Sequence, residues 1–292
     1  MTSIYRNEFS LLNQTFNLNN YNVLLVDLWG VLHDGYHLYP GSLATLYQLK
    51  QLNKDVILVS NAPRRKSTIK NLLDTLGIHQ SLYKALIVSG ELLFSFLKEK
   101  KIGSKYFYIG SVESGEIISS FNNYQRVDHP QSADFIILTS VVNCFNQAMD
   151  CAIKAIRYKV PLLCANPDIL SIRQNGELVY CSGTIARKYE QLGGEVIYFG
   201  KPYKNIYLHA LEGISLSRRI LAIGDSMEND IQGAINMNID SALVCSGIHM
   251  HDLKINVGEL PNKNNLLKLY KKYLVKPKFV LSIMSDIMKS QT

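Results

Sequence analysis

Two acidic turns hold the residues with the clearest chemical potential in this sequence. Asp27 follows the apolar run 23–26, and Asp225 follows Gly224 and the apolar run 220–223. An apolar strand that closes on a carboxylate places an acid at the carboxyl edge of a parallel sheet, where open α/β folds bind ligands. Two such acids brought together form a site for a hard cation, and one of them can also act as a nucleophile.

Two further turns contain groups that can hold negatively charged oxygens. One is Ser60-Asn61, and the other contains Lys201 between a glycine and a proline; each follows a short apolar run. A third acid, Asp230, lies five residues after Asp225. Phosphoryl transfer needs such a mixture, because the protein mainly positions groups and stabilises spread-out negative charge. Taken singly, Ser60-Asn61 is also compatible with a plain turn and Asp230 with a helix cap.

Alternating strand-like and helix-like segments must bring these turns together. We predict strands over residues 23–26, 56–59, 106–109, 135–138, 162–165, 196–199, 220–223 and 242–245. Amphipathic helical patterns lie between them, for example over residues 43–52, 68–76, 91–98 and 204–213. This alternation is typical of parallel βαβ units, so the turns are expected to meet at one sheet edge. Residues 173–177 are typical of a hairpin turn.

The number of strands favours two domains. Eight strands are many for one sheet in a chain of 292 residues. We expect an α/β fold with a Rossmann-like, doubly wound parallel core from residues 1–82 and 188–292, and an inserted α/β domain over residues 83–187. The amphipathic residues from Tyr273 onward are expected to cover the core.

Composition narrows the class of protein. The formal charge is +7, yet the basic residues form only short groups, so a nucleic-acid partner is not expected; a basic surface would instead steer an anionic substrate. No apolar stretch approaches the roughly 20 residues that cross a bilayer, and the start lacks a secretory pattern. The five cysteines include no C-x-x-C pair, which argues against structural zinc and disulfides. We therefore expect a cytoplasmic protein with no membrane partner, and cysteines that are buried as small hydrophobes.

The order of the four turns resembles the haloacid dehalogenase (HAD) superfamily of phosphohydrolases. The insertion between Ser60-Asn61 and Lys201 is similar to the C2-type cap of the class IIA, NagD-like branch. Three further segments match this branch: Asn166-Pro167-Asp168, residues 183–186 and Ser246-Gly247-Ile248. The resemblance covers roughly residues 21–248, nearly the whole predicted fold.

The resemblance implies a role for each matching residue. Asp27 would be the nucleophile that forms an aspartyl-phosphate, Ser60 and Asn61 would bind the phosphoryl oxygens, and Lys201 would pair with Asp27 and the phosphate. The substrate would be a small phosphorylated metabolite. A homodimer formed through the caps would be compatible with such an architecture, although nothing in the sequence requires one.

The same resemblance implies a magnesium site. Mg²⁺ would be held by the carboxylates of Asp27 and Asp225, with Asp230 in support. The backbone carbonyl of Trp29 would be a further ligand, which does not depend on its side chain.

The first motif, Asp-Leu-Trp-Gly-Val, departs from the family at Trp29. HAD phosphatases usually have a second aspartate there, which protonates the leaving oxygen and then activates water. Loss of a positioned acid–base typically costs about 10²–10⁴-fold in rate. Asp34 and His33 are candidate replacements, and the indole would either pack in the core or form a platform at the pocket.

These observations leave two functional hypotheses. The first is a Mg²⁺-dependent phosphatase of low activity. The alternative is a phosphometabolite-binding or regulatory protein that keeps the metal and phosphate site without efficient turnover. A nucleotide-binding Rossmann or P-loop protein is disfavoured because no G-x-G-x-x-G follows a strand.

Two other segments bear on the site. Residues 141–146 differ from the glycine and aspartate common in class IIA caps, so substrate identity does not transfer from a relative. His249 and His251, two apart in a predicted loop, are expected at the surface rather than as metal ligands.

Overall fold

The computed structural model describes residues 16–99, 102–141, 144–172, 176–215 and 217–291, and these form two compact units. Unit 1 comprises the described parts of residues 1–59, 72–86 and 210–292, and unit 2 those of residues 60–71 and 87–209. Each unit is built on its own parallel sheet. The fold class is α/β, as the alternating pattern predicts.

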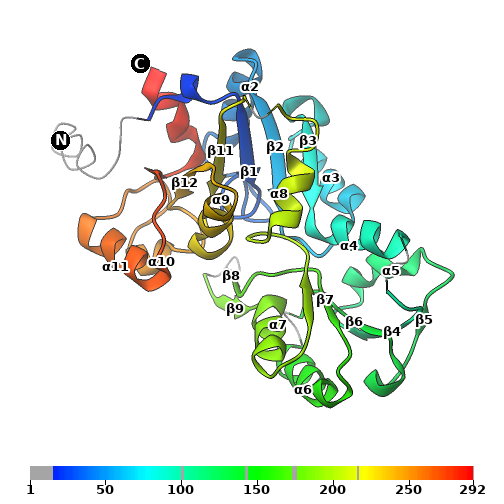
Figure 1. Cartoon of the computed structure of the whole chain (residues 1–292). Coiled ribbons are helices and arrows are strands. Elements are labelled where there is room, and N and C mark those ends of the chain that lie inside the picture. The colour runs from blue at the N-terminus through cyan, green and yellow to red at the C-terminus, as the bar shows by residue number, and fades with distance from the viewer. Residues whose placement is uncertain (1–15, 100–101, 142–143, 173–175, 216, 292) are drawn as a thin grey trace. The chain divides into compact units, whose positions relative to one another are not determined.

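The larger sheet has six strands in the order β13-β12-β11-β1-β2-β3. Figure 1 labels β12, β11, β1, β2 and β3, which follow one another in this order. Its strands are β1 (Val23–Asp27), β2 (Asp55–Ser60), β3 (Ala85–Val88), β11 (Ile220–Gly224), β12 (Asp240–Val244) and β13 (Phe279–Leu281). The strand β1 pairs in parallel with both β11 and β2, with Val26 opposite Ile223 and Asp27 opposite Val59. The two acid-ended strands are therefore neighbours, and their carboxyl ends lie at one edge of the sheet.

Amphipathic helices cover this sheet. The helices that belong wholly or partly to unit 1 are α2 (Ser42–Gln51), α3 (Lys66–Thr75), α8 (Lys204–Ala210), α9 (Gln232–Asn236), α10 (Met250–Leu253) and α11 (Lys263–Tyr273). In α11 the apolar positions Leu266, Leu269 and Tyr270 recur at helical spacing and pack on β12 and β13. The side chain of Asn262 caps the first turn by accepting from the Asn265 N–H at 2.9 Å.

The smaller sheet has five parallel strands in the order β10-β7-β6-β4-β5. They are β4 (Lys105–Ile109), β5 (Gln125–Arg126), β6 (Phe135–Leu138), β7 (Leu162–Cys164) and β10 (Val196–Tyr198), and the helices packed on them are α4 (Ser89–Lys98), α5 (Glu116–Ser119), α6 (Phe145–Ala155) and α7 (Ser182–Gln191). Side chains alternate across β6: Ile136 and Leu138 pack with α6 and α7, whereas Phe135 and Ile137 pack with α4 and α5.

All eight predicted strands are confirmed, and the predicted hairpin is present. The hairpin consists of β8 (Leu170–Ile172) and β9 (Leu178–Tyr180), which pair antiparallel, while residues 173–175 of its turn lie outside the described residues. The structure adds β3, β5 and β13. Within the described part of the chain, no helix is long and apolar enough to cross a membrane.

Two boundaries differ from the sequence-based expectation. The strand β10 extends the smaller sheet beside β7, although residues 188–292 were expected in the core domain. The reason is that its side chains, such as Tyr198, pack in the apolar cluster of unit 2. The chain end does more than cover the core: β13 forms the sheet edge against β12, and Met284 and Ile287 in the following 3₁₀ helix (Met284–Gln291) are buried.

Candidate functional site

Three of the predicted site residues form an acidic cluster in unit 1. Asp27 is the last residue of β1, Asp225 directly follows β11, and Asp230 lies in a one-turn π-helix (Met227–Ile231). One carboxylate oxygen from each lies within 4.8 Å of the other two. The structure therefore brings together the acids that the sequence places at separate turns.

Backbone groups hold these acids in place. Asp27 Oδ1 accepts from the Leu28 N–H at 2.7 Å, and Asp225 Oδ2 accepts from the Ile248 N–H at 2.7 Å. Gly30 has φ +83°, and a Cβ there would lie 2.0 Å from Asp225 Oδ2. Only glycine permits this close approach of the first turn to the second acid. The loops after β1 and β12 thus both contact Asp225.

The cluster has the donor set of a magnesium site. Carboxylate oxygens are the ligands that Mg²⁺ prefers, and two ligands on opposite sides of one ion lie about 4.2 Å apart. The three oxygens all lie within 4.8 Å of one another, so at most a small closure is needed to meet that distance. Because Asp225 and Asp230 are buried, their like charges repel at low dielectric, and a divalent cation relieves this repulsion. The residues present therefore fit such an ion.

The Trp29 side chain is partly exposed on the turn that follows Asp27. The indole is 38% exposed, so it is not a core residue. It lies against Gly35, where a Cβ would come within 2.3 Å of Trp29 Cζ3, and edge-on to the His33 ring at a centroid distance of 6.0 Å. The Gly30 N–H donates to the His33 carbonyl at 3.0 Å and closes the turn. An indole, with no carboxylate, thus stands two residues after Asp27.

Neither predicted replacement has the properties of a general acid. Asp34 Oδ1 accepts from the backbone N–H groups of Tyr36 and His37 at 2.9 and 2.7 Å. Partial burial raises the pKa of Asp34, but these backbone hydrogen bonds together lower it by more. The net pKa is therefore below its usual value. His33 is only 2% exposed, and burial lowers its pKa to about 4. A general acid must carry a proton near neutral pH, and both groups have lost theirs there.

The second group of predicted site residues belongs to unit 2. Ser60 ends β2 and its hydroxyl accepts from the Ala62 N–H at 3.2 Å. Asn61 Oδ1 accepts from the Lys201 N–H at 2.7 Å, and Nδ2 donates to the Lys201 carbonyl at 3.0 Å and to Asp168 Oδ1 at 2.7 Å. The Asn61 side chain, which we expected to bind phosphoryl oxygens, is thus occupied by hydrogen bonds within the protein.

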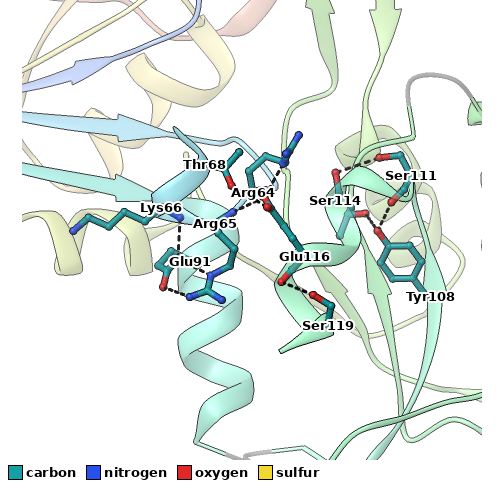
Figure 2. Close-up of polar contacts among 11 residues, drawn as sticks. Arg64, Arg65, Lys66, Thr68, Glu91, Tyr108, Ser111, Ser114, Glu116 and Ser119 are labelled. Carbon is teal, nitrogen blue, oxygen red and sulfur yellow. Dashed lines mark hydrogen bonds and ion pairs between the residues drawn. The ribbon is translucent and has the colours of Figure 1, made fainter. Parts of the chain in front are cut away.

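Two glutamates anchor the chain just after Ser60-Asn61, as Figure 2 shows. Glu116 Oε1 accepts from Arg64 Nε at 2.7 Å and from the Arg65 N–H at 3.0 Å. Glu91 Oε2 accepts from Arg65 Nε and from the Lys66 N–H, each at 2.9 Å. The helix α3 has no acid in its own first turn, so these carboxylates from α5 and α4 supply the N-terminal acceptors.

His249 contradicts the expectation of a surface position. It is only 4% exposed, and its Nε2 accepts from the Met227 N–H at 3.1 Å, at the start of the π-helix that contains Asp230. The reason is that the loop after β12 folds back over this helix start. The signal in the sequence was the position of His249 directly after Ser246-Gly247-Ile248, a segment that matches the class IIA branch.

The cysteines only partly follow the prediction. All five thiols are free; Cys164, Cys181 and Cys245 are buried, but Cys144 is intermediate and Cys151 is exposed. Cys151 lies on α6 at the flank of the face whose alanines pack on the sheet. Burial thus follows helix position rather than residue type.

Comparisons with known proteins agree with this architecture. The haloacid dehalogenase-like hydrolase family profile matches residues 24–123, and a HAD-hydrolase-like profile matches residues 198–262, so that together they span more than half of the chain. An acid sugar phosphatase of Staphylococcus saprophyticus is 21% identical over 79% of this chain and 89% of its own length. A dihydroxyacetone phosphatase of Corynebacterium glutamicum is 25% identical over 77% of this chain and 81% of its own length.

A solved structure has the same fold over nearly the whole chain. A hydrolase of the haloacid dehalogenase-like family from Brucella suis 1330 superposes with a TM-score of 0.74 at 25% identity. The match covers 91% of this chain and 96% of that one. It therefore includes both sheets rather than the larger one alone.

Proposed function

Because the chain belongs to the haloacid dehalogenase-like hydrolases, we propose that it is a Mg²⁺-dependent phosphatase acting on a small phosphorylated metabolite. The observation that carries the proposal is the convergence of Asp27, Asp225 and Asp230 within 4.8 Å. The relatives named as sugar and dihydroxyacetone phosphatases support a small phosphate monoester as the substrate class.

The proposed reaction passes through a covalent intermediate on Asp27. A carboxylate oxygen attacks phosphorus, the P–O bond to the leaving group breaks, and the leaving oxygen takes a proton from water to form the alcohol. Water then attacks the phosphorus of the aspartyl-phosphate, which releases inorganic phosphate and restores the carboxylate. The Ser60 hydroxyl and the Lys201 ammonium group stabilise the charge on the phosphoryl oxygens.

The proposed metal ligands are the carboxylates of Asp27, Asp225 and Asp230 and the carbonyl of Trp29. A bound Mg²⁺ supplies positive charge that offsets the negative charge of the transferring phosphoryl group.

The test is release of inorganic phosphate from a panel of sugar and triose phosphates, with Mg²⁺ and with chelator. We expect release only with Mg²⁺, and Asp27→Asn is expected to reduce it to the assay background. Asp74→Asn is the matched control, because Asp74 is an acid of unit 1 paired with His79 and outside the acidic cluster. Undiminished release by Asp27→Asn would exclude the covalent mechanism.

A second candidate function is favoured by the environment of Trp29. With an indole at the acid's position, a low pKa for Asp34 and a buried His33, the protein would bind a phosphometabolite and turn it over very slowly. This function predicts calorimetric binding of a phosphate monoester with Mg²⁺ but negligible phosphate release. Rapid turnover by the wild-type protein would remove it.

A further inference from the structure

A buried hydrogen-bond network surrounds the backbone of Lys201 within unit 2. Asn61 pairs with both backbone groups of this one residue, accepting from its N–H at 2.7 Å and donating to its carbonyl at 3.0 Å. Both residues are buried. The primary amide thus acts on Lys201 as a neighbouring peptide strand would, and holds two backbone groups that would otherwise be costly to bury.

Asp168 determines which way the Asn61 amide faces. Its Oδ1 accepts from Asn61 Nδ2 at 2.7 Å, and an ionised carboxylate can only accept. With the amide reversed, its oxygen would meet the carboxylate and its NH₂ group would meet the Lys201 N–H. Asp168 is itself held: its N–H donates to Asn166 Oδ1 at 2.9 Å, and its carbonyl accepts from the Gly183 N–H at 3.0 Å. The orientation of the amide is therefore fixed.

The backbone just before Lys201 is closely packed. Gly200 has φ +128°, and a Cβ there would lie 2.6 Å from Asn61 Oδ1. The Ser89 hydroxyl contacts the carbonyls of Ala165 and Phe199, and so joins the chain just beyond β7 to the chain just beyond β10. The backbone that leads to Lys201 is thus contacted by Asn61 and by Ser89.

From this network we infer that Asn61 is a positioning residue for Lys201, and that Asp168 orients it. The side chain of Asn61 fixes the backbone from which the Lys201 ammonium group extends; it does not bind phosphate itself. The inference rests on the proposed function only in giving Lys201 a phosphoryl group to neutralise. A lysine on a flexible stem gains precision when its own backbone is held, because fewer conformations compete with the productive one.

Amide hydrogen exchange tests the hydrogen bonds between the Asn61 side chain and the Lys201 backbone, and it does not require enzyme activity. The Lys201 N–H is expected to exchange about tenfold faster in Asn61→Ala, the result of losing one hydrogen bond. Pro202 has no N–H, so Lys201 has no exchanging neighbour directly on its C-terminal side. Asp168→Ala should also accelerate exchange, and Asp168→Asn should act less because it keeps an acceptor.

Asn205→Ala is the matched control for this measurement. Asn205 Nδ2 donates to the Tyr198 carbonyl at 2.7 Å, so the variant removes a similar bond in the same unit. It should leave the exchange of Lys201 unchanged. An unchanged exchange rate of the Lys201 N–H in both Asn61→Ala and Asp168→Ala would overturn the inference that Asn61 holds this backbone.

A double-mutant cycle with Lys201→Ala tests the role in function. Asn61→Ala should lower kcat/KM by about 10²-fold in the wild-type background, the effect typical of a misplaced group. In the Lys201→Ala background it should change kcat/KM by less than about twofold, because its partner is already gone. Equal losses in both backgrounds would mean that Asn61 acts directly, and would overturn the inference. Asp168→Ala, at the edge of the network, repeats the cycle should Asn61→Ala not fold.

The two proposals fail in different ways. A wild-type protein that releases no phosphate from any substrate contradicts the proposed phosphatase, and the same cycle is then read on the calorimetric affinity for inorganic phosphate with Mg²⁺. Additive losses there overturn the positioning role, and so does an unchanged exchange rate of the Lys201 N–H. Accelerated exchange together with non-additive losses supports it, whatever the turnover.

Discussion

At the residue scale, the turn after β1 determines which side chains are available to protonate the leaving group in the proposed reaction. Trp29 stands two residues after Asp27, is 38% exposed and packs on Gly35. Neither the hydrogen-bonded Asp34 nor the buried His33 holds a proton at neutral pH. In the proposed reaction, a poor leaving group would therefore depart as an unprotonated alkoxide unless water assists, and turnover on alkyl phosphates is expected to be slow.

Trp29→Asp should restore the missing acid. We expect kcat for an alkyl phosphate to rise by about 10²–10⁴-fold, the usual contribution of a positioned acid–base. Trp29→Asn, which has the same shape without the acid, should show no such gain. For 4-nitrophenyl phosphate the gain should be much smaller, because that leaving group needs no proton. Steady-state kinetics of both variants on both substrates check this, and equal rates for the two variants would contradict it.

His249 provides a second prediction at this scale. Its Nε2 accepts from the Met227 N–H at the start of the turn that contains Asp230. His249→Ala should therefore weaken Mg²⁺ binding by about 10–100-fold, as loss of a residue that orients metal ligands does. His251→Ala, which changes an exposed histidine two positions on, is the control and should leave the Mg²⁺ dissociation constant unchanged. Isothermal calorimetry with Mg²⁺ alone decides between these outcomes.

At the element scale, strands buried on both faces were the easiest to predict. The run Phe135–Leu138 is apolar throughout and matches β6 at both ends. By contrast, β13 has three residues at a sheet edge, and only its pairing with β12 makes it a strand. The strands β10 and β7 were both predicted, but their pairing in one sheet was not, because a local pattern does not specify which sheet a strand joins.

The candidate site, like the fold, was predictable where local sequence marks a residue and not where distant contacts decide its role. The acids are marked by the strands that precede them, so Asp27 and Asp225 could be found from local sequence. The role of the Asn61 side chain could not, because its partners Asp168 and Lys201 lie 107 and 140 residues away in the chain. Contacts of this range follow from the tertiary fold alone.

The anchoring of α3 yields a prediction for this scale. Glu116 accepts hydrogen bonds from Arg64, from the Arg65 N–H and from Thr68. Glu116→Ala should lower the free energy of unfolding by about 2 kcal/mol at pH 7, the contribution expected of hydrogen bonds to a partly exposed charged group. Chemical denaturation measures this loss, and Glu113→Ala, a fully exposed neighbour, is the control.

The same loss should depend on pH. Burial raises the pKa of Glu116, but its hydrogen bonds to Arg64, Arg65 and Thr68 together lower it by more. The net pKa is therefore below the usual 4.5. A depressed pKa in the folded state stabilises the protein above pH 4.5, and this stabilisation disappears as the pH falls through the folded value. The stability difference between wild type and Glu116→Ala should thus shrink below pH 4.5. A constant difference would contradict the ion pair as its source.

At the scale of the whole molecule, the two units differ in what they contribute. Each has its own apolar clusters, and the acidic cluster belongs to unit 1 whereas Asn61 and Lys201 belong to unit 2. In the proposed function, the cation would be held by the carboxylates of unit 1, and the phosphoryl oxygens would be stabilised by Ser60 and Lys201 of unit 2. Stabilisation by either ligand alone is expected to be local.

Hydrogen exchange with Mg²⁺ alone tests this separation. At 100 times its dissociation constant, Mg²⁺ should stabilise the binding unit by about 2.7 kcal/mol. Amides of β1 and β11 should gain protection, while those of β4 and β6 should change little. Asp225→Asn should abolish the gain. Equal protection of both sheets would show that the units respond to the cation as one body.

The position of Trp29 has one more consequence. It is the single tryptophan of the chain, partly exposed, on the same turn as Asp27. The intrinsic fluorescence of the native protein therefore comes mainly from the turn at which the proposed chemistry takes place. Its emission reports on that turn with no attached dye, so that cation and phosphate titrations can be followed optically in the unmodified protein.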